Sequence, residues 1–359
     1  MSKRICFTID TLGRGGAERV MSNLANFFAK LDNKYTVFFI CNRHAEKEYE
    51  LHPKVHQIFL CDEINISQYN CIAKIQQMFF LRKFFKVHNI DVGIAFMGGN
   101  NFALILSTLF QSTKSVVSVR NVPQHEYPTI LHKFLYTVLF PKANRIVFQT
   151  GEEMSYFCKR IRQKGIIIVN PVHDKFYHCN RKPTSNRIVS VGRLVEQKNH
   201  KLLIDAFGEI TAKYDSITLH IYGDGDLRED LERYIEIKQL QRKVLLHNSV
   251  VNIEKHICDA MMFVMTSNHE GMPNALMEAM AMGLPVISTD CAGGGPRELI
   301  DSGKNGILVR TKDDLMESMQ LLLDDENYRC YLADNARISA ESFHENNIFE
   351  IWEKLVDNL

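Results

Sequence analysis

The chain has 359 residues, of which 45% are hydrophobic and 24% are charged, with 19 glycines and 9 prolines. These values are ordinary for a globular protein of about two domains, so they exclude a disordered, collagen-like or coiled-coil chain. The longest apolar runs fall well short of the ~20 residues that a membrane span needs, and the first residues predict a strand rather than a signal peptide. Nine evenly spread cysteines without a CxxC pair favour reduced thiols in the cytoplasm.

The net charge of +1 conceals a difference between the two halves of the chain. Residues 1–170 hold 22 lysines and arginines against 12 acidic residues, a surplus of +10, whereas residues 171–359 hold 21 against 30, a deficit of −9. An asymmetry of this size indicates that the first half faces an anionic partner. The alternative is that surface charge has drifted independently in two domains.

Taken in chain order, short apolar runs alternate with stretches of helical periodicity. The runs that predict strands lie at 3–9, 35–41, 55–60, 92–96, 115–119, 145–149 and 166–169, and then at 187–191, 216–221, 243–247, 261–265, 285–289 and 306–309. Helices are expected between them, the first over residues 17–31 and later ones beginning near 198, 226, 252, 274 and 312. This alternation is typical of βαβ units, so the predicted fold class is α/β, with two doubly wound, Rossmann-like parallel-sheet domains.

The boundary between the domains is predicted at Asn170–Pro171, because proline holds the preceding residue extended. We therefore expect an N-terminal domain at 1–170 and a C-terminal domain at 171–343, with residues 344–359 forming a helix that packs back on the first domain. The polar, aperiodic residues 174–186 are typical of a connection. Ligands of doubly wound sheets bind beyond the carboxyl ends of the strands, so the expected active site is the cleft between the domains.

The strongest functional signal is the string TSNHEGMPNALMEAMAMG at 266–283, a polar loop that follows an apolar strand. Pro273 predicts the first position of a helix, where its missing N–H costs nothing. The unpaired N–H groups of Asn274 and Ala275 at this helix start then favour an anion such as a phosphate.

Two glutamates, Glu270 and Glu278, flank the predicted helix start. They are suited to accept hydrogen bonds from hydroxyl groups on either side of the anion, such as those of a nucleotide sugar. The alternative is that Glu270 caps the helix and Glu278 is a solvated helix residue.

A second string, VGRLVEQKN at 191–199, places Arg193 and Lys198 just after a strand. Arginine supplies a bidentate fork and lysine a point charge, the usual pair for a diphosphate. The alternative is that both are ordinary surface residues.

A third string, LGRGGAER at 12–19, is a glycine loop between the first strand and the first helix. It lacks the G-x-G-x-x-G spacing, and the second strand ends in Cys41–Asn42 without an acidic residue, so nicotinamide or flavin binding is disfavoured. Its glycines still let a ligand approach the helix start, and the alternative is a plain tight turn.

A fourth string, IYGDGDLRED at 221–230, contains the D-x-D pair Asp224 and Asp226, which is found in metal-dependent sugar transferases. We interpret Asp226 instead as a helix N-cap and Asp224 as part of a turn. The chain has no P-loop, HExxH or G-x-S-x-G motif, so the corresponding hydrolase chemistries lack their residues.

Together these strings resemble the retaining glycosyltransferases of family 4, which have the two-domain GT-B fold. The resemblance rests on EGMPNALMEAMAMGLPVI from Glu270, on GRL-x-x-x-K from Gly192 to Lys198, on GGAE at 15–18 and on GGGPRELIDSGKNGILV at 293–309. It covers nearly the whole chain and is more specific in the second half. It implies an enzyme that moves a hexose or N-acetylhexosamine from a nucleotide diphosphate-sugar, such as a UDP-sugar, with retention of configuration.

The resemblance also implies a role for each matching residue. Arg193 and Lys198 would neutralise the departing diphosphate and Glu270 would hold the donor sugar, which makes these three the catalytic set. Glu278 would hold the ribose. The other donor-binding positions would be Gly15, Gly16, Gly192, Gly271, Met272, Pro273, Asn274 and Ala275. No cofactor or metal is implied, because cationic side chains and the helix dipole stabilise the leaving group.

The sequence departs from the family at the place where many relatives carry a histidine near the donor sugar. Here SVVSVRNVPQH puts Arg120 and Asn121 at a strand end and His125 a few residues beyond, so these three are candidate contacts with donor or acceptor. The VRN string resembles the branch that builds lipid-linked glycans and surface polysaccharides such as lipopolysaccharide or capsule.

The implied partners are the nucleotide sugar, a saccharide acceptor carried on a lipid and an anionic membrane surface, without nucleic acid. We expect the protein on the inner face of the cell membrane, and segment 72–88 is a local candidate for the contact. Its apolar arc lies opposite a basic one, as in a helix that binds an anionic leaflet. The alternative is that the phenylalanines pack on the sheet and the lysines form the solvated face of the helix. The apolar arc is Phe80, Leu81, Phe84, Phe85 and Val87, and the basic arc is Arg82, Lys83 and Lys86.

Two other functions share these residues. A UDP-sugar epimerase of the same architecture would bind the donor without an acceptor, and a non-catalytic scaffold would bind the donor without breaking it. The paired glutamates argue against the epimerase. The basic residues Arg193 and Lys198 argue against a pure binder, which has no departing diphosphate to stabilise.

Overall fold

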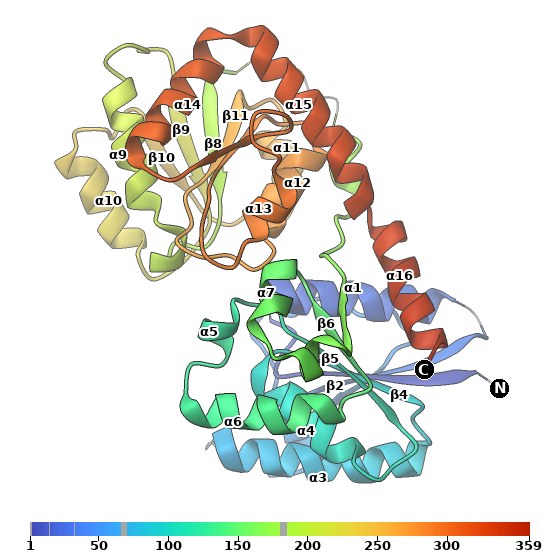
Figure 1. The fold of residues 1–359 in the computed structure, drawn as a ribbon. Helices are drawn as coiled ribbons and strands as arrows, with labels where there is room; N and C mark the ends of the chain where they lie inside the picture. Colours follow the sequence, from blue (N-terminus) through green and yellow to red (C-terminus); the bar gives the residue numbers. More distant parts are fainter. Residues whose placement is uncertain (1, 14, 32, 66–69, 180–184) are drawn as a thin grey trace. The chain divides into compact units, whose positions relative to one another are not determined.

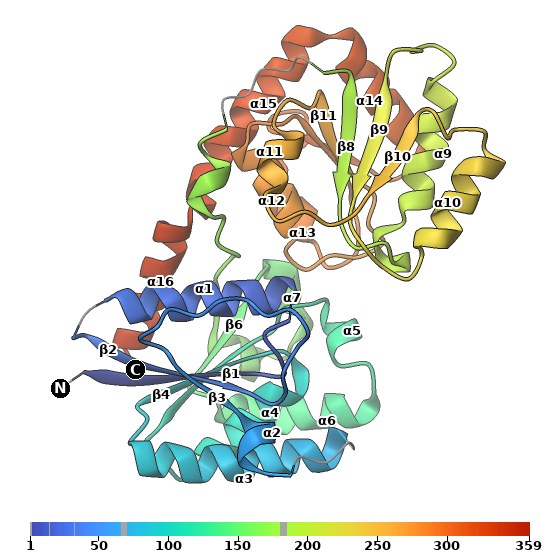
Figure 2. The same cartoon turned by 180° about the vertical axis from the view of Figure 1, so that it is seen from behind.

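The computed structural model describes residues 2–13, 15–31, 33–65, 70–179 and 185–359. Arg14 of the glycine loop and residues 180–184 of the expected connection lie outside these ranges. The chain forms two compact units: unit 1 is Met1–Asn170 with Asn346–Leu359, and unit 2 is Pro171–Glu345. Each unit is built on its own sheet, with helices on both faces (Figures 1 and 2).

The sheet of unit 1 has seven parallel strands in the order β3-β2-β1-β4-β5-β6-β7. The strands are β1 (Lys3–Ile9), β2 (Tyr35–Cys41), β3 (His56–Phe59), β4 (Val92–Phe96), β5 (Lys114–Ser118), β6 (Arg145–Phe148) and β7 (Gly165–Ile167). The central strand β1 pairs with β2 from Lys3 opposite Tyr35 to Ile9 opposite Cys41. Short apolar strands of this kind are buried on both faces, so the sheet needs helices on both sides.

Helices form two layers around this sheet. They are α1 (Gly16–Lys30), α2 (Leu60–Glu63), α3 (Asn70–His88), α4 (Gly98–Thr108), α5 (Pro123–Glu126), α6 (Ile130–Leu139), α7 (Gly151–Tyr156), α8 (Lys159–Arg162) and α16 (Glu345–Asp357). On one face, Phe28 of α1 and Trp352 of α16 share a core with Phe7 of β1. On the other face, Phe85 of α3 and Tyr136 of α6 belong to a second core.

The last helix, α16, completes unit 1 although it follows unit 2 in the sequence. Its side chains Phe349 and Trp352 are buried, and the Phe349 ring lies 5.0 Å from a phenylalanine ring of α1. Near its end, Asp357 forms a salt bridge of 2.9 Å with Lys34.

Helix α3 contains the apolar and basic arcs of segment 72–88. Leu81, Phe84 and Phe85 of the predicted apolar arc are buried, whereas Val87 is 63% exposed, so the arc is divided between the core and the surface. Arg82 of the basic arc donates hydrogen bonds to two backbone carbonyls at 3.3 and 2.7 Å. The inner phenylalanines of this helix therefore pack on the sheet.

The sheet of unit 2 has six parallel strands in the order β10-β9-β8-β11-β12-β13, the order of a Rossmann sheet. The strands are β8 (Arg187–Val191), β9 (Thr218–Tyr222), β10 (Val244–His247), β11 (Met262–Met265), β12 (Val286–Thr289) and β13 (Ile307–Val309). The helices are α9 (His200–Ile210), α10 (Arg228–Ile237), α11 (Ile253–Ile257), α12 (Asn274–Ala281), α13 (Gly295–Leu299), α14 (Lys312–Asp324) and α15 (Glu326–Ala340). The prediction of two doubly wound parallel sheets is confirmed, and every predicted strand lies within two residues of an observed one.

Candidate active site

Four loops leave the unit 2 sheet at one edge. Strand β8 pairs in parallel with β9 and β11, and β11 pairs with β12. The carboxyl ends of these strands therefore lie side by side, and the strand order reverses at β8, where such sheets bind ligands. The strings at 191–199 and 266–283 begin at β8 and β11, so strand order brings them together.

Hydrogen bonds fix the loop after β8 against the loop after β11. Gln197 donates from Nε2 to the His269 carbonyl at 2.9 Å, and its own carbonyl accepts from the Asn268 N–H at 2.8 Å. The Thr266 hydroxyl donates to the Lys198 carbonyl at 3.2 Å. The position of Lys198, at the end of a 3₁₀ turn (Glu196–Lys198), is thus set by the neighbouring loop.

Lys198 and Glu270 meet at the centre of this edge. Their side chains form a salt bridge between Nζ and Oε1 and are only 16% and 8% exposed. Ser267 donates from Oγ to the same Oε1 at 2.6 Å. A carboxylate buried to this extent is costly unless it is paired, and both partners stabilise it here. A predicted cation and a predicted carboxylate, 72 residues apart, form one charged centre.

Helix α12 begins beside this centre, one residue later than predicted. Pro273 is the N-cap, with an extended ψ of 102°, and is not the first helical residue, which is Asn274. Asn274 and Ala275 are partly exposed at the helix start. Glu278, in the second turn, is 7% exposed, so the interpretation of Glu278 as a solvated residue is wrong. The hydrogen bonds described for Glu270 go to Lys198 and Ser267 and not to the helix start.

The loop that contains Gly271 and Met272 is held by a close backbone approach. A Cβ at Gly295, the first residue of α13, would overlap the carbonyl oxygen of Gly271. The Glu270 N–H donates to the Ala292 carbonyl at 2.9 Å, and Met272 is 6% exposed. Glycine at 295 is therefore what allows the start of α13 to pack against this loop.

Gly192 and Arg193 form the opposite side of the centre. A Cβ at Gly192 would lie 3.3 Å from the side chain of Lys198, and a Cβ at Gly223 would overlap the Gly192 carbonyl. Arg193 is exposed, and its guanidinium makes a long hydrogen bond of 3.5 Å to Gln197. This exposed cation is the one that can turn toward a bound anion without leaving a buried partner unpaired.

His200 lies beneath this loop and stays neutral. Its Nε2 is 3.1 Å from the Arg193 carbonyl, an acceptor, so Nε2 carries the proton. Burial lowers the pKa of His200 to about 4. A charged imidazole at this position would be desolvated and would lie close to Lys198.

The first aspartate of the D-x-D pair, Asp224, has structural partners. Asp224 accepts hydrogen bonds from the Ser249 N–H at 3.1 Å and from Arg228 at 3.4 Å. The prediction that Asp226 caps the next helix is wrong, because α10 begins at Arg228 with Leu227 as its N-cap. One residue, Leu227, separates Asp226 from the helix.

In unit 1, the glycine loop ends at the start of α1. Gly15 is the N-cap and Gly16 the first helical residue. A Cβ at Gly15 would overlap the carboxylate of Glu18, which therefore folds back over the helix start. An acidic side chain there complements the positive end of the helix dipole.

Arg120 points into the interior of unit 1. Its guanidinium carbon lies 3.8 Å from the centroid of the Phe96 ring, and Nη1 donates to Asn170 Oδ1 at 2.8 Å. The ring centroid of Trp352 in α16 lies 5.8 Å from the same guanidinium carbon. Burial raises the pKa of Glu153, which faces Arg120, to about 8. The structure thus places the guanidinium of this candidate contact in the core of the unit.

Asn121 and His125 lie around a buried carboxylate. Glu126 accepts from the N–H groups of Gly98 at 2.9 Å, Arg120 at 2.9 Å and Asn121 at 3.0 Å, and burial raises its pKa. This network fixes the backbone after β5. His125 is exposed on the short helix α5.

Sequence reasoning missed Ser267, Gln197 and Gly295, which hold the centre in place. All three lie inside strings already singled out, and only their contacts give them a role. Among the described side chains, His44, Cys61 and Asp62 come close enough to share a metal ion, and they are in unit 1, outside these strings. Within the described ranges, no helix is both long and apolar enough to cross a membrane.

Comparison with known proteins adds a family. Residues 175–339 match the model of the glycosyl transferases group 1. A Campylobacter jejuni protein named GalNAc-alpha-(1->4)-GalNAc-alpha-(1->3)-diNAcBac-PP-undecaprenol alpha-1,4-N-acetyl-D-galactosaminyltransferase is 29% identical over 98% of both chains. The amylovoran biosynthesis glycosyltransferase AmsD of Erwinia amylovora is 25% identical over 96% of both. HepE of Anabaena in complex with UDP superposes with a TM-score of 0.80 over 99% of this chain and 100% of that one, at 15% identity. This last similarity shows the fold alone, and the GT-B prediction is confirmed.

Proposed function

We propose that this chain, whose residues 175–339 match the model of the glycosyl transferases group 1 and which has the GT-B fold, moves a hexose or N-acetylhexosamine from a nucleotide diphosphate-sugar to a lipid-linked saccharide. The observation that carries the proposal is the buried centre of Lys198, Glu270 and Ser267 beside the N-terminus of α12. A cation, a carboxylate and a helix start together match a donor that joins a diphosphate to a polyhydroxyl sugar.

The donor would bind with its diphosphate between Lys198, Arg193 and the first N–H groups of α12. These positive groups would stabilise the charge that develops on the diphosphate as the glycosidic bond breaks, in the place of a metal ion. Glu270 would accept hydrogen bonds from the sugar hydroxyls, and buried Glu278 from the ribose. In the bonds described, Lys198 and Ser267 both contact Oε1 of Glu270, so Oε2 is the atom we assign to the sugar.

We propose a UDP-sugar as donor and retention of the anomeric configuration. Several solved structures of the same fold contain UDP, and the relatives' names that specify an anomeric configuration describe α-transferases. A donor whose sugar is α-linked to the diphosphate gives an α-linked product only if the configuration is retained. Attack from the face that the diphosphate leaves would achieve this, with Glu270 positioning the sugar.

The acceptor is proposed from two relatives whose printed names contain diphospho-undecaprenol or PP-undecaprenol. An acceptor of this kind is embedded in a membrane, so the protein would have to reach its surface. The basic surplus of the first half is concentrated in residues 71–170, which hold 13 basic and 4 acidic residues. Two of those acids, Glu126 and Glu153, face the interior.

Helix α6 is a better candidate than α3 for the apolar part of a membrane contact. Ile130 and Phe134 are 88% and 63% exposed on it, with Lys133 exposed between them. Exposed large apolar side chains beside basic ones are typical of helices that lie in the interface of an anionic leaflet. We propose peripheral attachment through this face of unit 1.

The function is tested by incubating the protein with a panel of UDP- and GDP-sugars and measuring release of the nucleotide. Slow hydrolysis of one donor, faster when a saccharide acceptor is added, is the expected result. The anomeric proton coupling in the NMR spectrum of the product then reports retention or inversion. Formation of an epimer from the donor alone would show the epimerase, and binding without nucleotide release would show the scaffold.

A further inference from the structure

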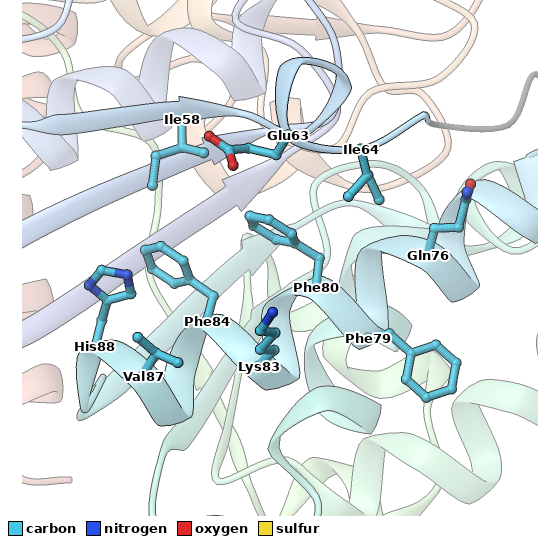
Figure 3. A pocket seen from close by; sticks show the side chains of 10 residues that line it. All are labelled: Ile58, Glu63, Ile64, Gln76, Phe79, Phe80, Lys83, Phe84, Val87 and His88. Atoms are coloured by element: carbon cyan, nitrogen blue, oxygen red, sulfur yellow. The ribbon is translucent and has the colours of Figure 1, made fainter.

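An apolar groove lies in unit 1 between helix α3 and the segment that contains β3 and α2. Its volume is about 660 Å³, within the ~300–1,000 Å³ typical of ligand pockets. Figure 3 shows Phe80 and Phe84 pointing from α3 toward Ile58 and Ile64, with the hollow between them.

The floor of the groove is aromatic and packed. Phe84 stacks on His88 with 4.1 Å between ring centroids and meets Phe38 of β2 edge-on at 5.5 Å. Phe80 stacks on Phe84 at 5.9 Å. These contacts pre-form the floor, so an apolar ligand would bind without reorganising the core.

The walls of the groove expose apolar side chains to solvent, which is unfavourable. Phe79 and Val87 line the groove and are 61% and 63% exposed, although each carries a large apolar side chain. An exposed apolar surface of this kind marks a binding site more often than a scattered single residue does.

The helix that forms one wall of the groove is basic. Helix α3 carries four lysines and arginines, among them Lys83 on the groove itself, and no acidic residue. Glu63 on the opposite wall is the one acidic side chain among the groove-lining residues that the structure describes. A ligand with an apolar chain and an anionic head matches this arrangement.

The groove has one end near the carboxyl edge of the unit 1 sheet. Lys74, two residues before the groove-lining Gln76, contacts Asp10 after β1 at 3.3 Å and Asn100 after β4 at 2.6 Å. From Gln76 to His88 the helix extends for about 18 Å, at 1.5 Å per residue, away from that edge. A chain whose head lies at the edge could therefore run along the groove for several isoprene units.

We infer that this groove binds the first isoprene units of the prenyl chain of the lipid-linked acceptor. The inference rests on the proposed function for the identity of the ligand. It assigns to α3 a role in selecting the acceptor's lipid, separate from the donor centre of unit 2.

The test uses the full chain and a benzophenone-bearing C15 isoprenyl diphosphate, irradiated without any donor. Labelling should map to the peptides of residues 58–64 and 76–88. Unlabelled C15 isoprenyl diphosphate should compete at least tenfold better than dihexanoyl phosphatidylglycerol, because each methylene buried in a fitting groove is worth roughly fourfold in affinity.

Val87→Asp should reduce this labelling at least fivefold, since it places a charge on the groove wall at an exposed position that folding tolerates. Ile75→Asp is the matched control: it is on the same helix and 53% exposed but does not line the groove, so its labelling should equal that of the wild type.

Labelling elsewhere, equal losses in the two variants, or equal competition by the phospholipid would overturn the inference. Because labelling needs no turnover, a labelled groove in a protein that transfers no sugar would overturn the proposed function instead. An active transferase with an unlabelled groove would reject the groove alone.

Discussion

The Lys198–Glu270 pair gives the sharpest prediction, because it separates a structural role from a catalytic one. In Lys198→Ala, the charge that we propose to stabilise the departing diphosphate is lost. Removing one preorganised group of this kind costs on the order of 3 kcal/mol in the transition state, roughly a hundredfold in kcat. The donor KM should change much less, because the diphosphate gains charge only as the bond breaks.

The same substitution has a predictable effect on stability. Glu270 is 6% exposed, so Lys198→Ala leaves its buried carboxylate with the Ser267 hydroxyl as the remaining described partner. Breaking a buried pair from one side costs up to ~3–5 kcal/mol. The Lys198 side chain is 16% exposed in the wild type, so water can reach this site once the lysine is removed. We therefore expect the free energy of unfolding, measured in urea, to fall by about 1–3 kcal/mol.

The double variant Lys198→Ala with Glu270→Gln separates the two effects. The neutral amide needs no cation, so the double variant should recover most of the lost stability and none of the lost kcat. Arg193→Ala is the matched control. Because the Arg193 side chain is exposed, this variant should lose activity while its free energy of unfolding changes by no more than about 0.5 kcal/mol. A Lys198→Ala protein that turns over within threefold of the wild type would refute the role of this residue.

Four further results are expected. Glu270→Ala should mainly lower kcat and Glu278→Ala should mainly raise the donor KM, and the opposite pattern in steady-state kinetics would show that their roles are exchanged. Acidification from pH 6.5 toward 4 should destabilise the protein, and buried His200, with its pKa of about 4, should contribute up to about 3 kcal/mol because the unfolded chain binds a proton that the folded chain resists. In urea unfolding, His200→Gln should show a shallower pH slope than the wild type, and an unchanged slope would contradict this contribution. Gly295→Ala should cost about 1–3 kcal/mol in stability and raise the donor KM, as its Cβ must displace the Gly271 backbone, and unchanged values would contradict the close approach. Wild type should sediment with anionic liposomes at low salt, and Phe134→Ser should reduce this binding; indifference to lipid charge would exclude attachment through the basic half.

The fold could be predicted from the sequence because it depends on local patterns. Each strand is a short apolar run, and the doubly wound order follows from alternation with amphipathic helices. The sequence segments that form the site could be predicted, since Lys198 and Glu270 each follow a strand. Their contact was not, because it depends on β8 and β11 being neighbours in the sheet, which no local pattern records.

Side-chain direction was the level at which sequence reasoning failed. Arg120 stands at a strand end, where ligands bind, but its guanidinium lies between Phe96 and a tryptophan that arrives 232 positions later in the chain. Val87 fits an apolar arc on a helical wheel, yet the buried stripe of α3 passes through Leu81 and Phe85 instead. In both cases a distant packing partner decides the direction of the side chain.

The paired charges also explain how a donor site can be buried before its ligand arrives. Lys198 would be costly to desolvate alone, and so would Glu270, but each neutralises the other in the free protein. A bound diphosphate would bring a second anion to Lys198, and exposed Arg193 on the same loop could supply the further cation that restores the balance. The carboxylate of Glu270 would then be less tightly held by lysine and better able to accept a sugar hydroxyl. Donor binding would in this way convert a structural ion pair into two catalytic contacts, which is why the stability and the activity of the Lys198 variants should separate.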